Sequence, residues 1–157
     1  MKIRHVKSAN RRSEFQIETR SGATYTYPYA KCTPHPSADD RVSEVFVDKE
    51  LGNEAFTYGL ESGAEGSIHI EQVLEYNGDP NYLANLLIYR LTVEAQRSME
   101  TCGLSRRQVA KRLNTSVPQL YRLLDPANTK KSMGQLVTLL HILDCEVDIV
   151  VTKGTAA

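Results

Sequence analysis

Residues 105–126, "SRRQVAKRLNTSVPQLYRLLDP", decide the fold of the second half of this 157-residue chain. Two runs with a helical spacing of apolar residues flank the polar step Asn114-Thr115-Ser116, and five basic side chains lie among them. Ser105 and Ser116 precede the runs, and a serine hydroxyl there accepts a hydrogen bond from the free amides of a first helical turn. Asp125-Pro126 ends the second run, because proline disfavours helix in the residue before it. The stretch predicts either a helix-turn-helix or two solvated basic surface helices.

The positions of small, turn and apolar residues favour the helix-turn-helix. Its two helices can cross closely where one of them has a small residue, here Ala110, and the turn between them requires a residue that tolerates a positive φ. Asn114 or Thr115 occupies that turn, and asparagine visits such a backbone conformation more readily than most residues do. The shared core is expected to contain Leu113, Leu120 and Leu123.

The spacing from Ala110 through Asn114 to Leu120 resembles that of XRE-type regulators, the Cro and phage-repressor family. The resemblance covers residues from about 90 to 145, and it implies that the second helix of the pair enters the major groove of DNA. It also implies that Arg106 reaches a phosphate and that the base edges are contacted by Ser116, Val117, Pro118, Gln119, Tyr121 and Arg122. The chain departs from the family at two positions: Asn114 stands where glycine is common, and Pro118 stands where many relatives have a polar side chain.

The net charge of zero conceals an asymmetry along the chain. Residues 1–82 carry 9 Lys and Arg against 13 Asp and Glu, whereas residues 83–157 carry 10 against 6. Between residues 104 and 131, seven basic side chains are accompanied by Asp125 alone, which gives this segment a net charge of +6. A basic patch on a neutral protein indicates a polyanion at one site, and we expect double-stranded DNA. The side chains expected to neutralise its phosphates are Arg106, Arg107, Lys130 and Lys131.

The first half of the chain has the alternation of β-strands. Residues 14–30 predict a hairpin, and four or five short strands are expected in residues 1–76. Tyr25, Tyr27 and Tyr29 share one face of that hairpin and form either part of a core or a platform for a partner or ligand. At Asn77-Gly78-Asp79-Pro80 the pattern becomes helical. The predicted domains are therefore residues 1–78, rich in β-structure, and residues 79–157, which are helical.

The helical half begins with a long segment. Asp79 is the predicted N-cap of a helix that starts at Pro80, carries an apolar stripe from Leu83 to Met99 and stops at Gly103. Ser132 caps a later helix, and the alternating β-branched residues 147–151 predict a strand. The expected fold class is α+β: a small antiparallel β N-terminal domain followed by an all-α, lambda-repressor-like helix-turn-helix domain with a short C-terminal strand.

Several classes of function are disfavoured. The cysteines and histidines are scattered without metal-ligand spacing, and no phosphate-binding glycine loop or nucleophile elbow occurs. We therefore expect no enzymatic activity, no metal and no cofactor. An apolar stretch of membrane-spanning length and a signal peptide are both lacking, so the sequence predicts a cytoplasmic protein without a membrane partner.

The leading functional prediction is a sequence-specific DNA-binding transcriptional regulator, a repressor that acts as a homodimer. The N-terminal domain would then provide dimerisation, sensing or the binding of a protein partner. The long helix is covered either by the N-terminal sheet or by a second subunit through Ala84, Ile88, Leu91 and Ala95. Two alternatives remain open: an antitoxin-like repressor of a toxin-antitoxin operon, and a protein or RNA interaction module that uses the basic helices.

Overall fold

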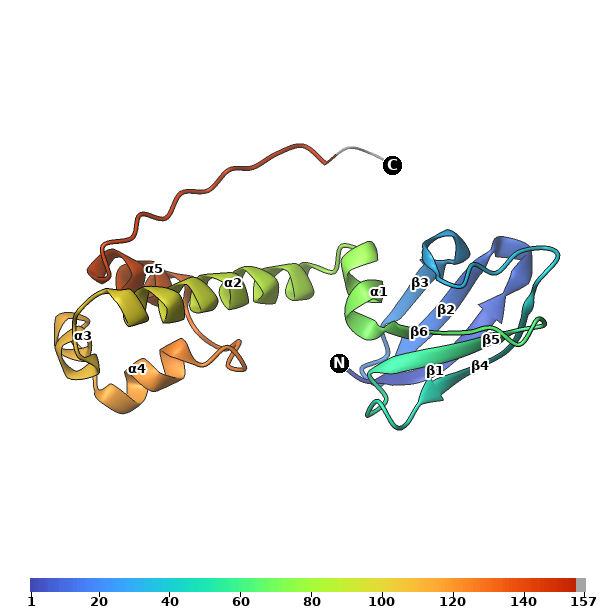
Figure 1. The fold of residues 1–157 in the computed structure, drawn as a ribbon, viewed down its shortest axis with the longest axis horizontal. Coiled ribbons are helices and arrows are strands. Elements are labelled where there is room, and N and C mark those ends of the chain that lie inside the picture. The colour runs from blue at the N-terminus through green and yellow to red at the C-terminus, as the bar shows by residue number, and fades with distance from the viewer. Residues whose placement is uncertain (155–157) are drawn as a thin grey trace. The chain divides into compact units, whose positions relative to one another are not determined.

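The computed structural model describes residues 1–154. The chain forms two compact units, Met1–Leu83 and the remainder from Ala84 (Figure 1). The first unit contains all the strands and one short helix, and the second unit contains most of the long helix and the three helices that follow it.

The first unit begins with a three-stranded antiparallel sheet. Its strands β1 (Ile3–Ala9), β2 (Glu14–Thr19) and β3 (Thr24–Pro28) lie in the order β1-β2-β3. Strands β2 and β3 pair across a tight turn, which confirms the predicted hairpin. Because successive side chains of a strand point to opposite faces, Phe15 and Ile17 are buried while their neighbours face outward.

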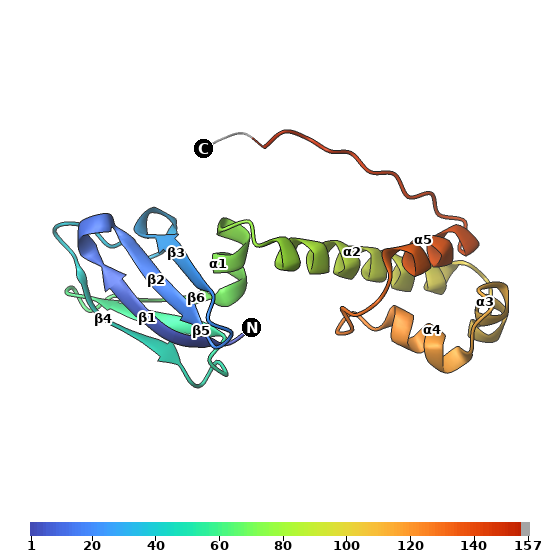
Figure 2. The ribbon, with the colours of Figure 1, turned by 180° about the vertical axis from the view of Figure 1, so that it is seen from behind.

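A second antiparallel sheet completes this unit and is followed by a helix. Strands β4 (Val42–Asp48), β5 (Ala55–Leu60) and β6 (Glu65–His69) lie in the order β4-β5-β6, and β4 runs close to β1. Helix α1 (Ile70–Tyr76) starts directly after β6 and packs against β3 (Figure 2). The sequence alone predicted four or five strands and no helix before residue 79. Ile70, Val73 and Leu74 are buried at a helical spacing, but a helix of seven residues is too short for that spacing to distinguish it from a strand or loop.

The core between the sheets is built around aromatic rings. The ring of Phe15 lies 4.8 to 5.1 Å, between centroids, from those of Tyr29, Phe56 and Tyr58. Tyr58 is completely buried, and its hydroxyl donates to the carbonyl of Pro34 at 2.6 Å. Gly66 faces the Tyr58 ring, and a Cβ at that position would lie 2.6 Å from the Tyr58 Cζ. Glycine is therefore required there by space rather than by backbone conformation.

The three tyrosines of the predicted platform belong to this core. Tyr27 and Tyr29 are buried, and Tyr25 is half-buried against the same cluster. The hydroxyl of Tyr29 donates to the Asn10 Oδ1 at 2.8 Å, and the hydroxyl of Tyr25 donates to the Asp79 Oδ2 at 2.9 Å. Of the two interpretations of this strand face, the core is confirmed.

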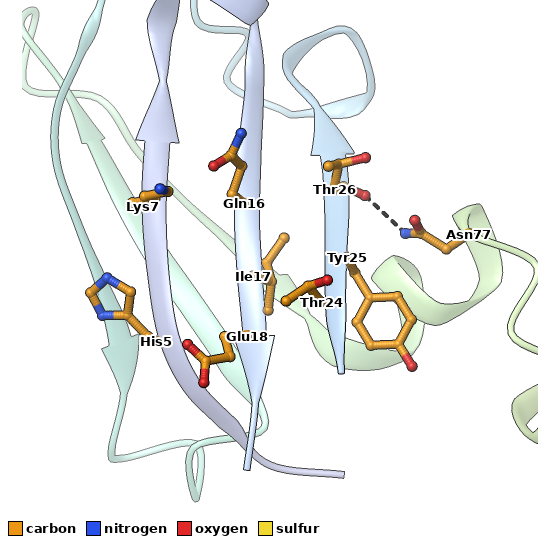
Figure 3. A pocket seen from close by; sticks show the side chains of 9 residues that line it. All are labelled: His5, Lys7, Gln16, Ile17, Glu18, Thr24, Tyr25, Thr26 and Asn77. Carbon is orange, nitrogen blue, oxygen red and sulfur yellow. Dashed lines mark hydrogen bonds between the residues drawn. The ribbon is translucent and has the colours of Figure 1, made fainter. Parts of the chain in front are cut away.

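The free edge of β3 is partly blocked by side chains. Among the described residues β3 pairs with β2 alone, so its outer edge is available to another strand. Asn77, at the end of α1, donates its side-chain amide to the carbonyl of Thr26 at 2.8 Å (Figure 3). The same amide also donates to the carbonyl of Val73 at 2.7 Å. Pro28 has no amide hydrogen to offer at the end of the strand. A further strand would therefore find few free groups here.

Helix α2 (Pro80–Thr101) begins at the predicted cap. The Asp79 Oδ1 accepts from the amide of Tyr82 at 2.9 Å, while the other carboxylate oxygen accepts from the Tyr25 hydroxyl. These two hydrogen bonds, the amide first and the hydroxyl second, hold the pKa of Asp79 below its usual value of 3.8. Gly103, with φ of 69°, follows the helix as predicted.

Acidification is expected to remove this cap. Because the folded pKa of Asp79 is depressed, its contribution to stability is complete at neutral pH and is lost as the pH falls below 3.8 through the folded pKa. We expect the Tyr25→Phe variant, which lacks the second donor, to show a higher Asp79 pKa in a carboxyl-carbon NMR titration. Tyr89→Phe, at an exposed tyrosine of α2, is the control and should leave the titration unchanged. An identical titration in Tyr25→Phe would contradict the role given to the hydroxyl.

The second unit packs three short helices against the C-terminal part of α2. They are α3 (Arg106–Arg112), α4 (Val117–Leu124) and α5 (Met133–Ile142). Ser105, Ser116 and Ser132 accept hydrogen bonds from the amides three residues later, so all three predicted serine caps are confirmed. The core of the unit is aliphatic, and its fully enclosed members are Ala95, Val109, Leu120, Leu136 and Leu139.

The predicted fold class is wrong. The first unit has two three-stranded sheets and a helix rather than one small sheet of four or five strands, and no strand follows α5 among the described residues. Residues 147–151 are extended and exposed. Their β-branched alternation fits a strand, yet a strand is stable only when a neighbour accepts its backbone hydrogen bonds and covers one face. Residues 84–154 contain no other strand.

Candidate nucleic-acid interface

The turn between α3 and α4 is closed by backbone hydrogen bonds. Asn114 adopts a left-handed conformation with φ of 54°, and its amide donates to the carbonyl of Lys111 at 3.1 Å. The amide of Thr115 donates to the carbonyl of Ala110 at 2.9 Å. This pair of bonds is the Schellman arrangement, in which glycine is the usual left-handed residue and asparagine an accepted substitute. The missing glycine therefore leaves the turn intact.

The two helices are held together by residues predicted for this purpose. Ala110 is buried where α3 contacts α4, and Leu120 and Leu123 are buried on the inner side of α4. Leu113 and Val117 are half-buried against the same cluster. Val117 was predicted to contact a base edge, but much of its side chain packs against the core. Pro118 is exposed in the first turn of α4, where the lack of an amide hydrogen costs no helical bond.

An open groove of about 880 Å³ lies between α4 and the start of α5. Gln119 and Arg122 reach it from α4, and Lys130 reaches it from the loop that follows. A second hollow of about 680 Å³ is lined by Arg107 and Lys111 of α3. Asn114 and Thr115 line both, so the two hollows adjoin at the turn.

The residues that line these two hollows are basic or uncharged. We call the five exposed side chains that converge on them the basic strip, which consists of Arg107, Lys111, Gln119, Arg122 and Lys130. Among the described residues, no Asp or Glu lines either hollow, and none of the five side-chain ends has a hydrogen-bond or ion-pair partner within that part of the chain. The strip is therefore a solvated surface of four cations and one amide, which favours an anionic partner.

Lys131 serves the fold rather than this surface. Its ammonium donates to the carbonyls of Leu123 at 2.8 Å and Asp125 at 2.6 Å, and burial lowers its pKa. The carbonyl of Leu124 accepts from the Gln96 side chain at 2.9 Å. These donors satisfy carbonyls that a helix leaves free at its C-terminus, where a positive charge is also favourable. Lys131 lines the groove, and the sequence predicts that it neutralises a phosphate. Its ammonium is instead bonded to the two carbonyls at the end of α4.

Arg106 and Tyr121 form a pair outside the basic strip. The Arg106 Nη1 donates to the Tyr121 hydroxyl at 3.0 Å, and the guanidinium carbon lies 4.9 Å from the centre of the ring. Both line a third hollow, of about 790 Å³, which shares no residue with the other two and is also lined by Glu100 and Asp125. The structure thus separates these two predicted contact residues from Gln119 and Arg122.

Some residues of the interface were missed from sequence. Thr115, Asn128, Gln135 and Thr138 line the groove of about 880 Å³, and Lys111 lines its neighbour. The signal for Gln135 and Thr138 was their three-residue spacing on the outer side of a helix with buried leucines at positions 136, 139 and 140. Ser116 was included in the prediction, but its hydroxyl accepts from the amide of Gln119 at 3.3 Å as the cap of α4.

An open hollow of the first unit lies on the outer face of the β1-β2-β3 sheet (Figure 3). It measures about 450 Å³ and is lined by polar side chains of both charges, among them Lys7, Gln16 and Glu18. His5 and Asn77 border it as well. The mixture of charges gives this hollow no preference for an anion, in contrast to the basic strip.

Other kinds of site have little basis in residues 1–154. No group of three or more His, Cys, Asp or Glu side chains there could hold a metal ion, and the three cysteines are free. None of the helices in the same range is both long and apolar enough to cross a membrane. Comparisons with protein-family models, with curated proteins and with solved structures found no match to the chain.

Proposed function

We propose that this protein is a sequence-specific DNA-binding regulator of transcription that binds double-stranded DNA through the basic strip. One observation carries the proposal: besides Lys131, whose ammonium is bonded to backbone carbonyls, the two hollows that meet at the Asn114 turn present four cations and no carboxylate. Neutralising phosphates releases counterions from DNA, and this supplies much of the affinity of such proteins. The helix pair is short, exposed and joined by a tight turn, which suits the insertion of α4 into a major groove.

Two side chains of α4 are proposed to contact base edges. Gln119 and Arg122 are three residues apart, so they lie on the same face of the helix, and both reach the same groove of the protein. A glutamine amide can pair with adenine through two hydrogen bonds, and an arginine can do so with guanine. Arg107, Lys111 and Lys130 flank them and are proposed to contact phosphates.

We propose further that the regulator acts as a homodimeric repressor. A single helix pair contacts few base pairs, whereas two copies related by a two-fold axis contact two half-sites of a palindrome. Measurement of the mass in solution, for example by light scattering at micromolar concentration, tests this part separately. A monomer that stays monomeric on its selected duplex would contradict it.

The decisive experiment is selection of bound duplexes from a random pool at physiological salt. The expected result is an enriched motif with two inverted half-sites, bound far more tightly than random duplex. Binding that depends on salt but enriches no sequence would contradict specific recognition. Equal or tighter binding of single-stranded RNA would instead support the interaction-module alternative.

Removal of one proposed base contact should change specificity. The Arg122→Ala variant is expected to bind the selected duplex about 5- to 150-fold more weakly, the range that corresponds to 1 to 3 kcal/mol for a bidentate pair. Binding to random duplex should weaken much less. Arg112→Ala is the matched control, because Arg112 is an exposed arginine of α3 that lines none of the three hollows of the second unit. Equal losses on both duplexes would reduce Arg122 to a phosphate contact.

A further inference from the structure

We propose that Arg106 acts on DNA through Tyr121, as a positioning residue that makes the Tyr121 hydroxyl a hydrogen-bond donor, and makes no phosphate contact of its own. The inference rests on the proposed function. It reverses the role that the sequence resemblance implied for Arg106, which was direct contact with a phosphate.

The geometry ties the two side chains together in two ways. Arg106 is the first residue of α3, and Tyr121 lies on the outer face of α4 with 51% of its surface exposed. The guanidinium carbon lies 4.9 Å from the centre of the ring, within the range of a cation–π contact, and the Arg106 Nη1 donates to the phenol oxygen at 3.0 Å. Two contacts from one planar group fix the ring more firmly than either contact would alone.

The direction of the hydrogen bond determines what the hydroxyl can do. Arginine has only donors, so the phenol oxygen has to be the acceptor in this pair. The hydroxyl hydrogen then remains for a second partner, and no atom of residues 1–154 accepts it. The pair therefore presents a donor to solvent, and the partner on DNA has to be an acceptor. Phosphate oxygens and several base edges of the major groove meet that requirement.

The charges around Arg106 favour this indirect role. Glu100 and Asp125 line the same hollow as the pair, although neither forms an ion pair with Arg106. Two carboxylates that line the same hollow as the guanidinium make this hollow less favourable for a phosphate than the basic strip is. The basic strip, by contrast, contains no carboxylate and is the better place for phosphates.

A double-mutant cycle on the selected duplex tests the proposal. Arg106→Ala and Tyr121→Phe are each expected to weaken binding by about 2- to 10-fold, the effect of one hydrogen bond, and the double variant should be no weaker than the weaker single variant. Tyr121→Phe keeps the ring and its packing and removes the hydroxyl alone. Arg112→Ala again controls for the loss of one positive charge from α3.

The salt dependence separates positioning from direct contact. A lost phosphate contact lowers the slope of log affinity against log salt by about 0.9, whereas a positioning residue leaves the slope unchanged. We expect the slope of Arg106→Ala to equal that of the wild type. Comparison with random duplex identifies the DNA atom that accepts from the Tyr121 hydroxyl. If Tyr121→Phe weakens the binding of both duplexes equally, the acceptor is a phosphate oxygen. If it weakens the binding of the selected duplex alone, the acceptor is a base edge.

Three results would overturn the inference while leaving the proposed function in place. They are a loss in Arg106→Ala without one in Tyr121→Phe, additive losses in the double variant, and a reduced salt slope in Arg106→Ala alone. NMR of the free protein gives an independent check, because the stacked pair predicts that Arg106→Ala shifts the Tyr121 ring signals and Arg112→Ala does not. If the wild-type protein selects no duplex, the proposed function fails and the inference fails with it.

Discussion

Replacing Leu120 with alanine is expected to lower the free energy of unfolding of the second unit by about 2 to 5 kcal/mol. Leu120 is completely buried on the inner side of α4, in the cluster that also contains Val109, Leu136 and Leu139. Removing its three terminal carbons leaves a cavity that the neighbouring side chains of α3 and α5 can fill only partly. Because α4 is eight residues long and depends on tertiary packing, the whole helix pair should loosen with it.

The change is measured by urea unfolding followed by circular dichroism, with NMR amide signals of α3 and α4 to assign the transition. Leu87→Ala is the matched control, since Leu87 is a leucine of α2 with 50% of its surface exposed. That control should change stability by no more than about 0.5 kcal/mol. Comparable losses in the two variants would show that α4 is not held by this leucine. DNA binding by Leu120→Ala should fall in proportion to the unfolded fraction.

Replacing Gly66 with alanine is expected to destabilise the first unit by about 3 kcal/mol, at the upper end of the range for overpacking. The added methyl group would overlap the Tyr58 hydroxyl and lie 2.6 and 2.9 Å from two carbons of its ring. Tyr58 has no room to move, because it is completely buried against Phe15 and its hydroxyl is bonded to Pro34.

Gly59→Ala provides the control within the same sheet. Its methyl group would meet the Glu44 side chain, with the Cγ at 3.2 Å, and that flexible chain can turn away. We expect a cost well below that of Gly66→Ala in thermal unfolding followed by NMR signals of β5 and β6. A Gly66→Ala variant as stable as Gly59→Ala would mean that the Tyr58 ring is not confined as described.

Signals carried by a few neighbouring residues predicted the structure well. Ser105, Ser116 and Ser132 cap helices, and Asp79-Pro80 begins the long one, because a cap depends on atoms within one helical turn. The prediction of a strand at residues 147–151 was wrong for the opposite reason. Its alternation is as clear as that of β2, yet a strand also needs a partner, and a sequence pattern does not contain one.

The candidate site was predicted only in outline. The basic segment and the two helices were recognised from composition and spacing, but the partners of individual side chains depend on tertiary structure. Lys131 is next to Lys130 in sequence, and only Lys131 reaches the carbonyls at the end of α4. Arg106 and Arg107 are likewise adjacent, and only Arg106 has an aromatic ring within reach. From charge alone, all four side chains were expected to neutralise phosphates.

Asn77 links the edge of the first sheet to the end of a helix. The same side-chain amide bonds the carbonyl of Thr26 in β3 and that of Val73 in α1. A strand from another molecule that bonded to the carbonyl of Thr26 would have to displace this amide, and the carbonyl of Val73 would then keep only the backbone amide of Asn77 as a donor. Polymerisation through β3 therefore costs hydrogen bonds that the monomer already has, and this free-energy penalty disfavours the β3 edge as a place for strand addition.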